Sequence, residues 1–285
     1  MQAEPLRRVL AVHDLSGFGH TSLLAVIPLL NKLGIRVCAL PTALLSANTD
    51  FPGYRWTDLS AQMEGLIRHW QELELSFDAI GTGFLASERQ AELVAEAIHR
   101  LRGASTLVLV DPVMGDNGSL YKCFGPAMIP ALRSLTALAD VVTPNYTEAA
   151  LLAGADPRSL AEEARILDWC RAIGELGPRR VIVTSVPGRD PQRLEVLYFS
   201  VAEDSLARFP FPSDGQPHPG AGDCFSALVL GGLVNGCQAG TAIRAAVQIM
   251  SRAIGIGIPP VSDWREGIWL EQVLSWDLRS YYHQD

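Results

Sequence analysis

Length, composition and charge exclude several classes of protein. The chain has 285 residues, 48% of them hydrophobic, which is enough to bury the core of one sizeable α/β domain. The formal net charge is −8, and the charges form no block of one sign. This pattern argues against a nucleic-acid partner and against a polybasic membrane patch. None of the five cysteines forms a Cys-x-x-Cys pair, so we expect reduced thiols, no zinc site and a cytoplasmic protein.

The most apolar stretches do not predict a membrane partner. Residues 224–243 carry no charge, but glycines and polar residues interrupt them, which favours a buried helix and its turn over a membrane span. The apolar run after Arg7 and Arg8 stops at His13 and Asp14, which is too soon for a signal sequence.

Short apolar runs alternate with longer helical patterns along the chain. This alternation predicts βαβ units and a three-layer α/β/α fold around a mostly parallel, doubly wound central sheet, in one domain of residues 1–285. A late antiparallel pair, 194–201 and 207–211, is expected at a sheet edge. In chain order, the expected strands are 9–12, 36–40, 77–80, 106–110, 140–143 and 180–184, and the expected helices between them are 21–33, 59–73, 88–101, 126–138 and 160–176.

Polar and glycine-rich segments follow almost every expected strand. Open α/β sheets bind their ligands at the carboxyl ends of the strands, so these segments predict one ligand-binding edge. In chain order they are 13–17, 46–49, 81–83, 111–112, 144–145 and Ser185.

Gly220, Ala221, Gly222 and Asp223 precede a long apolar run. They predict a tight turn that opens a helix, where free backbone N–H groups and the helix dipole hold an anion. Asp223 would lie beside that anion and could take a proton from an attacking hydroxyl, which points to phosphoryl transfer to an alcohol. A helix cap with an N-terminal acid explains the same four residues, so the rest of the chain has to decide.

Two acidic motifs have both a catalytic and a structural interpretation. Asp111 and Asp116 lie on one loop after a strand, where they could hold Mg²⁺ or stabilise a turn. Asn145 and Glu148 have the spacing of a capping box, and Glu148 could also face a metal through water.

With these motifs in order, the chain resembles the pyridoxal kinases of the ribokinase-like superfamily over residues 9–258. Asp-Pro-Val-Met-Gly-Asp, Thr-Pro-Asn-x-x-Glu and Gly-x-Gly-Asp form a specific combination. The opening His-Asp-Leu-Ser-Gly-Phe-Gly-His is similar to the pyridoxamine kinase branch, close to hydroxymethylpyrimidine kinases. The resemblance implies a homodimer that phosphorylates the 5′-hydroxymethyl group of a vitamin B6 vitamer (pyridoxal, pyridoxamine or pyridoxine) with ATP. The matching segments are 46–49, 81–87, 111–121, 143–148, 183–185 and 220–223.

The resemblance also implies a role for each matching position. Asp223 is the base, and the amides of Gly220, Ala221 and Gly222 hold the transferred phosphate. Mg²⁺ and a monovalent cation, K⁺ or Na⁺, are the implied ions. The implied metal group is Asp111, Asp116, Thr143 and Glu148; the nucleotide group is Asp111, Tyr121, Asn145, Glu148, Thr184 and Ser185; and the substrate group is Asp14, Ser16, Thr49 and Phe84.

Three positions depart from the pyridoxal kinase pattern. Ala221 stands where threonine is usual, Phe84 where tyrosine is frequent, and Asn48 where a histidine is common. The departures leave the vitamer open. The alternatives are a hydroxymethylpyrimidine kinase of thiamine synthesis and a catalytically weak protein that binds B6 or a nucleotide.

Overall fold

The computed structural model describes residues 6–158, 163–188, 190, 192–259 and 262–283. By its internal contacts the chain divides into two compact units. Unit 1 comprises Met1–Gly81, Leu101–Thr106 and Gln216–Asp285, and unit 2 comprises Thr82–Arg100 and Leu107–Gly215. The single domain expected over residues 1–285 therefore remains a prediction.

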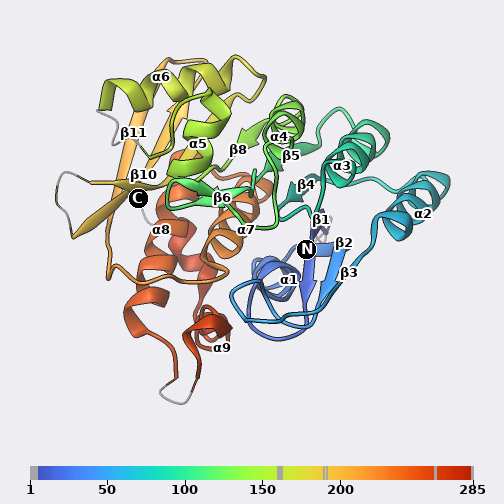
Figure 1. Ribbon diagram of the computed structural model, residues 1–285, viewed down its shortest axis with the longest axis horizontal. Helices are drawn as coiled ribbons and strands as arrows, with labels where there is room; N and C mark the ends of the chain where they lie inside the picture. The colour runs from blue at the N-terminus through green and yellow to red at the C-terminus, as the bar shows by residue number, and fades with distance from the viewer. Residues whose placement is uncertain (1–5, 159–162, 189, 191, 260–261, 284–285) are drawn as a thin grey trace, which may run out of the picture. The chain divides into compact units, whose positions relative to one another are not determined.

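The main sheet has nine strands in the order β11-β10-β9-β8-β5-β4-β1-β2-β3. The pairs β1–β2, β5–β8 and β8–β9 are parallel, whereas β9–β10, β10–β11 and β2–β3 are antiparallel. The mostly parallel sheet with flanking helices is thus confirmed, as is the antiparallel pair at one edge (Figure 1). The crossovers of βαβ units explain why consecutive parallel strands alternate with helices.

Unit 1 is built around β1, whose residues Val9 to Val12 are at most 1% exposed. Strand β1 pairs in parallel with β2, with a shift of register between His13 and Leu15. Helix α1 buries Leu23, Val26, Leu29 and Leu30. The elements of this unit are β1 (Arg8–Ser16), α1 (Ser22–Lys32), β2 (Arg36–Leu45), β3 (Trp56–Asp58), α2 (Ser60–Glu72), β4 (Ala79–Thr82, which ends at the first residue of unit 2), α7 (Ala221–Val234), α8 (Ala239–Ile256), η1 (Trp264–Glu266), α9 (Leu270–Leu274) and η2 (Leu278–His283).

Unit 2 carries the other parallel strands and the antiparallel pair. Val108, Val110, Val141 and Val142 are fully buried on β5 and β8, as expected for strands covered on both faces. The elements are α3 (Glu88–Leu101), β5 (Leu107–Val110), β6 (Gly115–Asp116), β7 (Ser119–Leu120), α4 (Met128–Thr136), β8 (Val141–Val142), α5 (Tyr146–Ala153), α6 (Glu163–Gly174), β9 (Arg180–Pro187), β10 (Arg193–Ser200) and β11 (Ser205–Pro212).

Helix α7 is the buried helix predicted from the uncharged run. Nearly all of its residues are buried, and an added Cβ at Gly232 would lie 2.6 Å from the ring of Tyr282. Glycine therefore lets the C-terminal η2 pack directly on α7, where the Tyr282 hydroxyl donates to the Leu228 carbonyl at 2.8 Å. Among the helices that the structure describes, none is long and apolar enough to cross a membrane.

Several strand boundaries predicted from the sequence were wrong. Strand β1 continues through His13 and Asp14 to Ser16, and β2 continues to Leu45. Strand β3 and the β6–β7 hairpin were not predicted at all. The strand ends were expected where charged and polar residues begin. Asp14 nevertheless lies within the buried strand, only 4% exposed, because its carboxylate is hydrogen-bonded. Of the expected helix 160–176, residues 160–162 lie outside the described residues.

Candidate active site

The glycine turn of unit 1 has the geometry predicted for it. Gly220 adopts φ +78° and caps α7, and an added Cβ there would collide with the His20 carbonyl. The Ala221 amide donates to the His218 carbonyl at 3.0 Å, so in this structure it closes the turn. At Gly222, an added Cβ would meet no atom of the described residues within 4 Å. The turn therefore has an open approach on the Gly222 side, at the positive end of a 14-residue helix.

Asp223 lies in the first turn of α7 and is held from the segment that joins β1 to α1. The Ser22 backbone N–H donates to Asp223 Oδ2 at 2.8 Å. His13 Nδ1 lies 3.4 Å from Asp223 Oδ1 and makes no hydrogen bond to the described residues, although it is buried. The Asp223 side chain is 15% exposed. Asp223 is thus an oriented carboxylate with partial access to solvent, as a general base requires.

Asp14 is the second acid of this group. The Ser22 hydroxyl donates to Asp14 Oδ1 at 2.5 Å, and the Ser16 hydroxyl donates to Oδ2 at 3.0 Å. Burial raises the pKa of Asp14, and the nearby charge of Asp223 adds to this, while the two serines act in the opposite direction. Asp14 and Ser16, both predicted to contact substrate, therefore bond to each other below the surface.

Asn48 and Thr49 differ in their surroundings. Asn48 is 6% exposed, and its Nδ2 donates to the Arg265 carbonyl at 2.7 Å. Its Oδ1 accepts from the Asp50 N–H at 3.0 Å. Asn48, one of the three departures from the pyridoxal kinase pattern, thus links the loop after β2 to the 3-10 helix η1 by a hydrogen bond. Thr49 is exposed, so it is free to meet a ligand.

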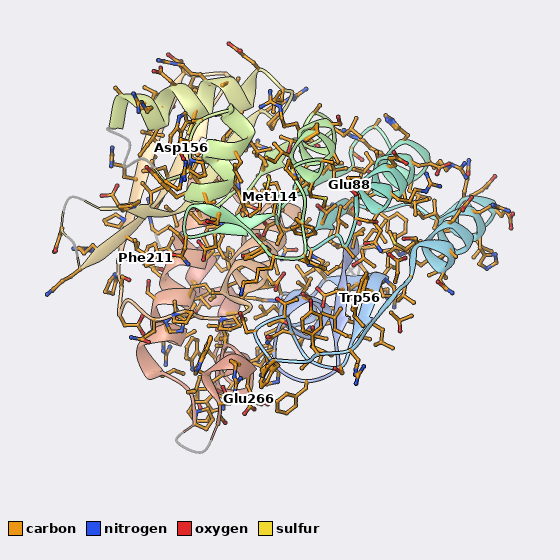
Figure 2. The ribbon with its side chains drawn as sticks, viewed as in Figure 1. Trp56, Glu88, Met114, Asp156, Phe211 and Glu266 are labelled. Carbon is orange, nitrogen blue, oxygen red and sulfur yellow. The ribbon has the colours of Figure 1, made fainter. Side chains whose placement is uncertain are left out.

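In unit 2, one carboxylate joins a helix to a hairpin. Glu148 and Asn145 form a full capping box at the start of α5, which confirms the capping interpretation. Glu148 Oε1 also accepts the backbone N–H of Met114 at 3.0 Å, just before β6 (Met114 is labelled in Figure 2). Asn145 Nδ2 donates to the Gly115 carbonyl at 2.8 Å, and the Thr147 hydroxyl accepts the Gly118 N–H at 2.9 Å. The hairpin is therefore fixed on the N-terminus of α5.

Asp116 lies at the corner of this hairpin and is exposed. It pairs with Ser119 across a two-residue loop of Asn117 and Gly118, both with positive φ. This is the type I′ turn that Asn-Gly favours. The Asp116 carboxylate accepts the Asn117 N–H at 2.7 Å. Asp116 therefore stabilises this turn, as one of its two interpretations predicted.

Asp111 and Glu148 are the buried acids of unit 2, 5% and 2% exposed. Burial raises the pKa of Glu148 well above its ordinary value, and the negative charge of Asp111 raises it further. A bound cation would offset that repulsion. Within the described residues no three His, Cys, Asp or Glu side chains are grouped so as to hold a metal. A pair of acids nevertheless fits Mg²⁺, which usually takes one or two carboxylates and completes its shell with water and phosphate.

Thr143 directly follows β8, whereas Thr184 and Ser185 lie within β9, which continues past its predicted end at residue 184 to Pro187. Thr143 is buried, and the Thr184 N–H donates to the Pro144 carbonyl at 2.9 Å, next to the capping box. The β9–β10 register shifts between Glu195 and Leu197, and Ser185 has φ +56°. Such a bulge redirects a side chain away from the ladder, and Ser185 is exposed there.

Phe84 and Tyr121 both adjoin Phe124. The rings of Phe84 and Phe124 are stacked, with centroids 5.4 Å apart, and Tyr121 lies 6.5 Å from Phe124. Phe84 therefore already uses its ring for a contact with a second protein ring.

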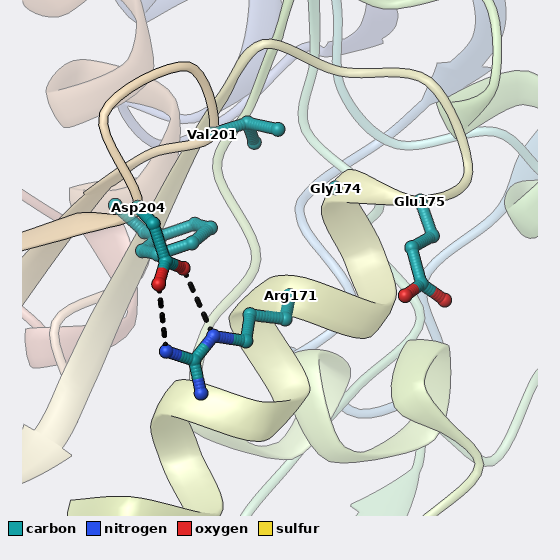
Figure 3. Close-up of a pocket in the computed structure, with 6 residues that line it drawn as sticks. Arg171, Gly174, Glu175, Val201 and Asp204 are labelled. Atoms are coloured by element: carbon teal, nitrogen blue, oxygen red, sulfur yellow. Dashed lines mark hydrogen bonds and ion pairs between the residues drawn. The ribbon is translucent and has the colours of Figure 1, made fainter.

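The hollow in Figure 3 lies apart from the predicted site residues of unit 2. It has a volume of about 240 Å³ and is lined by Arg171, Gly174, Glu175, Phe199, Val201 and Asp204. Arg171 and Asp204 satisfy each other through two hydrogen bonds, of 2.9 and 2.8 Å. Phe199 pairs with Val181 at the amino end of β9, whereas Thr184 and Ser185 lie toward its carboxyl end. The hollow is therefore not part of the predicted site.

Comparison with known proteins shows the family of the chain. The sequence pattern described as phosphomethylpyrimidine kinase matches residues 30–262. A pyridoxal kinase PdxY from Rubrobacter xylanophilus is 33% identical over 239 residues, covering 80% of each chain. These matches, together with the nine-stranded sheet, define a kinase of the ribokinase-like class. The chain belongs to the phosphomethylpyrimidine kinase family, and its predicted resemblance to pyridoxal kinases is confirmed.

Two crystal structures are similar over nearly the whole chain. One, from Bacteroides thetaiotaomicron VPI-5482, assigned to phosphomethylpyrimidine kinase and crystallised with pyridoxal, is 38% identical with a TM-score of 0.91, covering 95% of each chain. The other, pyridoxal kinase from Lactobacillus plantarum, is 28% identical with a TM-score of 0.88, covering 98% of this chain and 99% of its own.

Sequence reasoning missed Ser22, which binds both acids of unit 1 and was included only in an expected helix. His13 belongs to the segment 13–17 that was predicted at the ligand-binding edge, and its Nδ1 lies 3.4 Å from Asp223 Oδ1. A buried strand that runs into His-Asp was the available signal, since buried charged groups require partners. The identity of those partners needed the tertiary structure, because Ser22 and Asp223 are 201 positions apart.

Proposed function

We propose that this protein is an ATP-dependent kinase that phosphorylates the 5′-hydroxymethyl group of a vitamin B6 vitamer. The observation that carries the proposal is Asp223, an oriented and partly exposed carboxylate in the first turn of a helix that begins at an open glycine turn. Family membership supports the same reaction class.

In the proposed reaction the substrate hydroxyl oxygen bonds to the γ-phosphorus of ATP, the bond from that phosphorus to the ADP oxygen breaks, and the hydroxyl proton passes to Asp223. Ser22 N–H keeps one oxygen of Asp223 engaged, so the other is left to receive the proton. The Gly220–Gly222 turn is proposed to hold the transferred phosphoryl group by backbone N–H groups, because an anion is favoured at a helix N-terminus. The Ala221 N–H donates to the His218 carbonyl, so its contact with the phosphoryl group would require it to change partner.

Unit 2 supplies the proposed nucleotide and metal groups. Asp111, Thr143 and Glu148 would hold Mg²⁺ directly or through water, and exposed Asp116 would join them. When bound, Mg²⁺ neutralises phosphate charge. The buried Asp111–Glu148 pair supports this assignment because its repulsion is relieved by a cation. Asn145, Thr184, Ser185 and Tyr121 are proposed to contact ATP, and a K⁺ or Na⁺ ion to lie near Asp111 and Thr143.

The ring of the vitamer is proposed to contact Phe84, Thr49, Ser16 and Asp14. An apolar wall with a few polar groups is the usual composition of such a pocket. Thr49 is exposed and Phe84 half-buried, which supports direct contact. Ser16 is buried and engaged with Asp14, so its contact would require the Ser16 hydroxyl to change partner.

A hydroxymethylpyrimidine is the second candidate substrate. The match to the phosphomethylpyrimidine kinase pattern favours it specifically, and both substrates present a hydroxymethyl group on a nitrogen heterocycle. A coupled assay of ADP release with pyridoxal, pyridoxamine, pyridoxine and hydroxymethylpyrimidine separates the two. Highest kcat/KM with a B6 vitamer supports the first proposal, and preference for the pyrimidine supports the second. Absence of turnover with all four would indicate a binding protein.

We also propose a cytoplasmic homodimer. Five free cysteines among the described residues support a reducing compartment. Strand β3 is a sheet edge with Trp56 52% exposed, which is a candidate contact for a second copy. Light scattering of the purified protein tests the dimer, and a monomeric mass at micromolar concentration would refute it.

A further inference from the structure

Ser22 makes two hydrogen bonds that link the two acids of unit 1. Its hydroxyl donates to Asp14 Oδ1 at 2.5 Å, and its backbone N–H donates to Asp223 Oδ2 at 2.8 Å. The residue is 5% exposed, so neither bond competes freely with water. We propose that Ser22 is a positioning residue for Asp223, and that Asp14 serves it as an anchor. The inference rests on the proposed function, in which Asp223 is the base.

The backbone of Ser22 supports this role. Its φ is +51°, a value that residues with a Cβ adopt reluctantly. The other non-glycine residues with positive φ in the described chain lie in turns, in the β6–β7 hairpin or at the β9 bulge; they are Glu74, Asn117, Ser185 and Asp204. Ser22 instead begins a helix. A conformation of this kind persists only where the surroundings determine it, and the hydroxyl bond to Asp14 is such a determinant.

The consequence is a fixed direction for one N–H group. With φ near +51°, the Ser22 N–H donates to Asp223 Oδ2. A hydrogen bond to a carboxylate favours its charged form and limits its rotation. The same segment adjoins the anion turn, since a Cβ on Gly220 would collide with the His20 carbonyl. The base therefore contacts Ser22, and the turn packs against the His20 carbonyl.

Among the described residues, the charged or titratable groups that bear on Asp223 are His13, Asp14 and the buried thiol of Cys224, whose pKa the charge of Asp223 helps to raise. His13 Nδ1 lies 3.4 Å from Oδ1, and Asp14 repels Asp223 through its charge. None of the three donates a hydrogen bond to Asp223 in the described structure. Ser22 is thus the donor that sets the orientation of this carboxylate. In a purely structural account, Asp223 would merely cap the first turn of α1.

Three variants separate these accounts. Ser22→Ala removes the hydroxyl and keeps the Cβ that disfavours positive φ. Ser22→Gly also removes the hydroxyl but adopts positive φ without steric cost. Thr21→Val is the matched control, because the buried Thr21 hydroxyl has no hydrogen-bond partner among the described residues.

We expect kcat to fall about ten-fold or more in Ser22→Ala and by less in Ser22→Gly, because misplacement of a catalytic group lowers the rate of the chemical step. KM for pyridoxal and for ATP should stay within about two-fold of the parent. Thr21→Val should keep the parent kcat. A crystal structure of Ser22→Ala should show the distance from the residue 22 nitrogen to Asp223 Oδ2 longer than a hydrogen bond.

Other outcomes overturn the inference. A raised KM for pyridoxal with unchanged kcat in both Ser22 variants would make the hydroxyl a substrate contact. A lower melting temperature with unchanged kcat would make Ser22 a helix cap only. If the parent phosphorylates neither B6 vitamers nor hydroxymethylpyrimidine, the proposed function fails. The Ser22→Ala crystal structure then still decides the positioning: an unchanged distance refutes it.

Discussion

Glu148 and Asn145 cap each other's backbone at the start of α5: the Asn145 side chain accepts the Glu148 N–H at 2.9 Å, and Glu148 Oε2 accepts the Asn145 N–H at 2.8 Å. The other Glu148 oxygen, Oε1, accepts the N–H groups of Met114 at 3.0 Å and Gly115 at 3.4 Å. Glu148 Oε2 accepts one backbone N–H and so retains acceptor capacity, and capping and metal binding do not exclude each other. The rigid cap would hold Glu148 in place for a metal-bound water.

The metal role of Asp116 is separable from its turn role. We expect Asp116→Asn to raise the Mg²⁺ concentration for half-maximal activity by about ten-fold, the scale seen for residues that act on a metal through its ligands. Asn retains an oxygen for the Asn117 N–H, so the hairpin should survive. Mg²⁺ titration of kinase activity measures the effect.

Asp156→Asn is the control for that titration, since Asp156 is an exposed acid of unit 2 paired with Arg158. It should leave the Mg²⁺ requirement unchanged. If Asp116→Asn lowers only the melting temperature and keeps the parent Mg²⁺ dependence, Asp116 is a turn residue and nothing more.

Phe84 is predicted to form a wall of the ring pocket. Phe84→Ala should raise KM for B6 vitamers about ten-fold, the equivalent of about 1.4 kcal/mol, and leave KM for ATP nearly unchanged. Steady-state kinetics with each vitamer measures this. Phe124→Ala, which removes only the ring stacked on Phe84, should have a smaller effect. Parent-like kinetics in Phe84→Ala would place the vitamer elsewhere.

Because of Asp14, we expect the free energy of unfolding to depend on pH. Burial raises its pKa, so the folded state binds the proton more tightly than the unfolded state and ionisation of Asp14 destabilises the fold. This penalty is absent below the ordinary aspartate pKa, grows as pH rises through the raised pKa, and is complete above it. Asp14→Asn should therefore gain stability relative to the parent as pH rises, measured by urea unfolding from about pH 3.5 to 7.5.

Asp204→Asn is a control of opposite sign. The hydrogen bonds from Arg171 lower the pKa of Asp204, so its contribution favours the fold above the ordinary pKa and is lost as pH falls. Its effect should be small because the pair is exposed. A pH-independent difference between Asp14→Asn and the parent would show that Asp14 is not a penalised buried charge.

The sequence predicted the parts of the fold that depend on local patterns. Buried parallel strands such as β5 appear as apolar runs, and the capping box has a fixed spacing from Asn145 to Glu148. The β6–β7 hairpin also had a local signal, Asn117-Gly118. This signal was not used, because the loop was interpreted only as a metal site or as a turn stabilised by Asp side chains.

Long-range partners could not be predicted in the same way. Ser22 contacts Asp14 through its side chain and Asp223 through its backbone, and a backbone donor leaves no trace in residue identity. The partner of Asn48 is likewise a backbone group, the Arg265 carbonyl, so no sequence motif marks this contact. The sequence therefore predicted which kinds of residue follow the strands and form the candidate site. The contacts that orient these residues could be found only in the structure.

The base assignment carries the whole account. Asp223→Asn retains the size of the side chain and an oxygen for the Ser22 N–H, but an amide cannot take the proton of the hydroxyl. General-base catalysis contributes about 10²–10⁴-fold to rate, so kcat should fall by that factor while ATP affinity stays nearly unchanged.

The most direct measurement is kcat of the parent and of Asp223→Asn with pyridoxal and saturating MgATP, alongside the dissociation constant of ATP for both proteins. The account predicts turnover in the parent, a loss of about 10²–10⁴-fold in the variant and equal ATP binding. Equal kcat in the two proteins would contradict it.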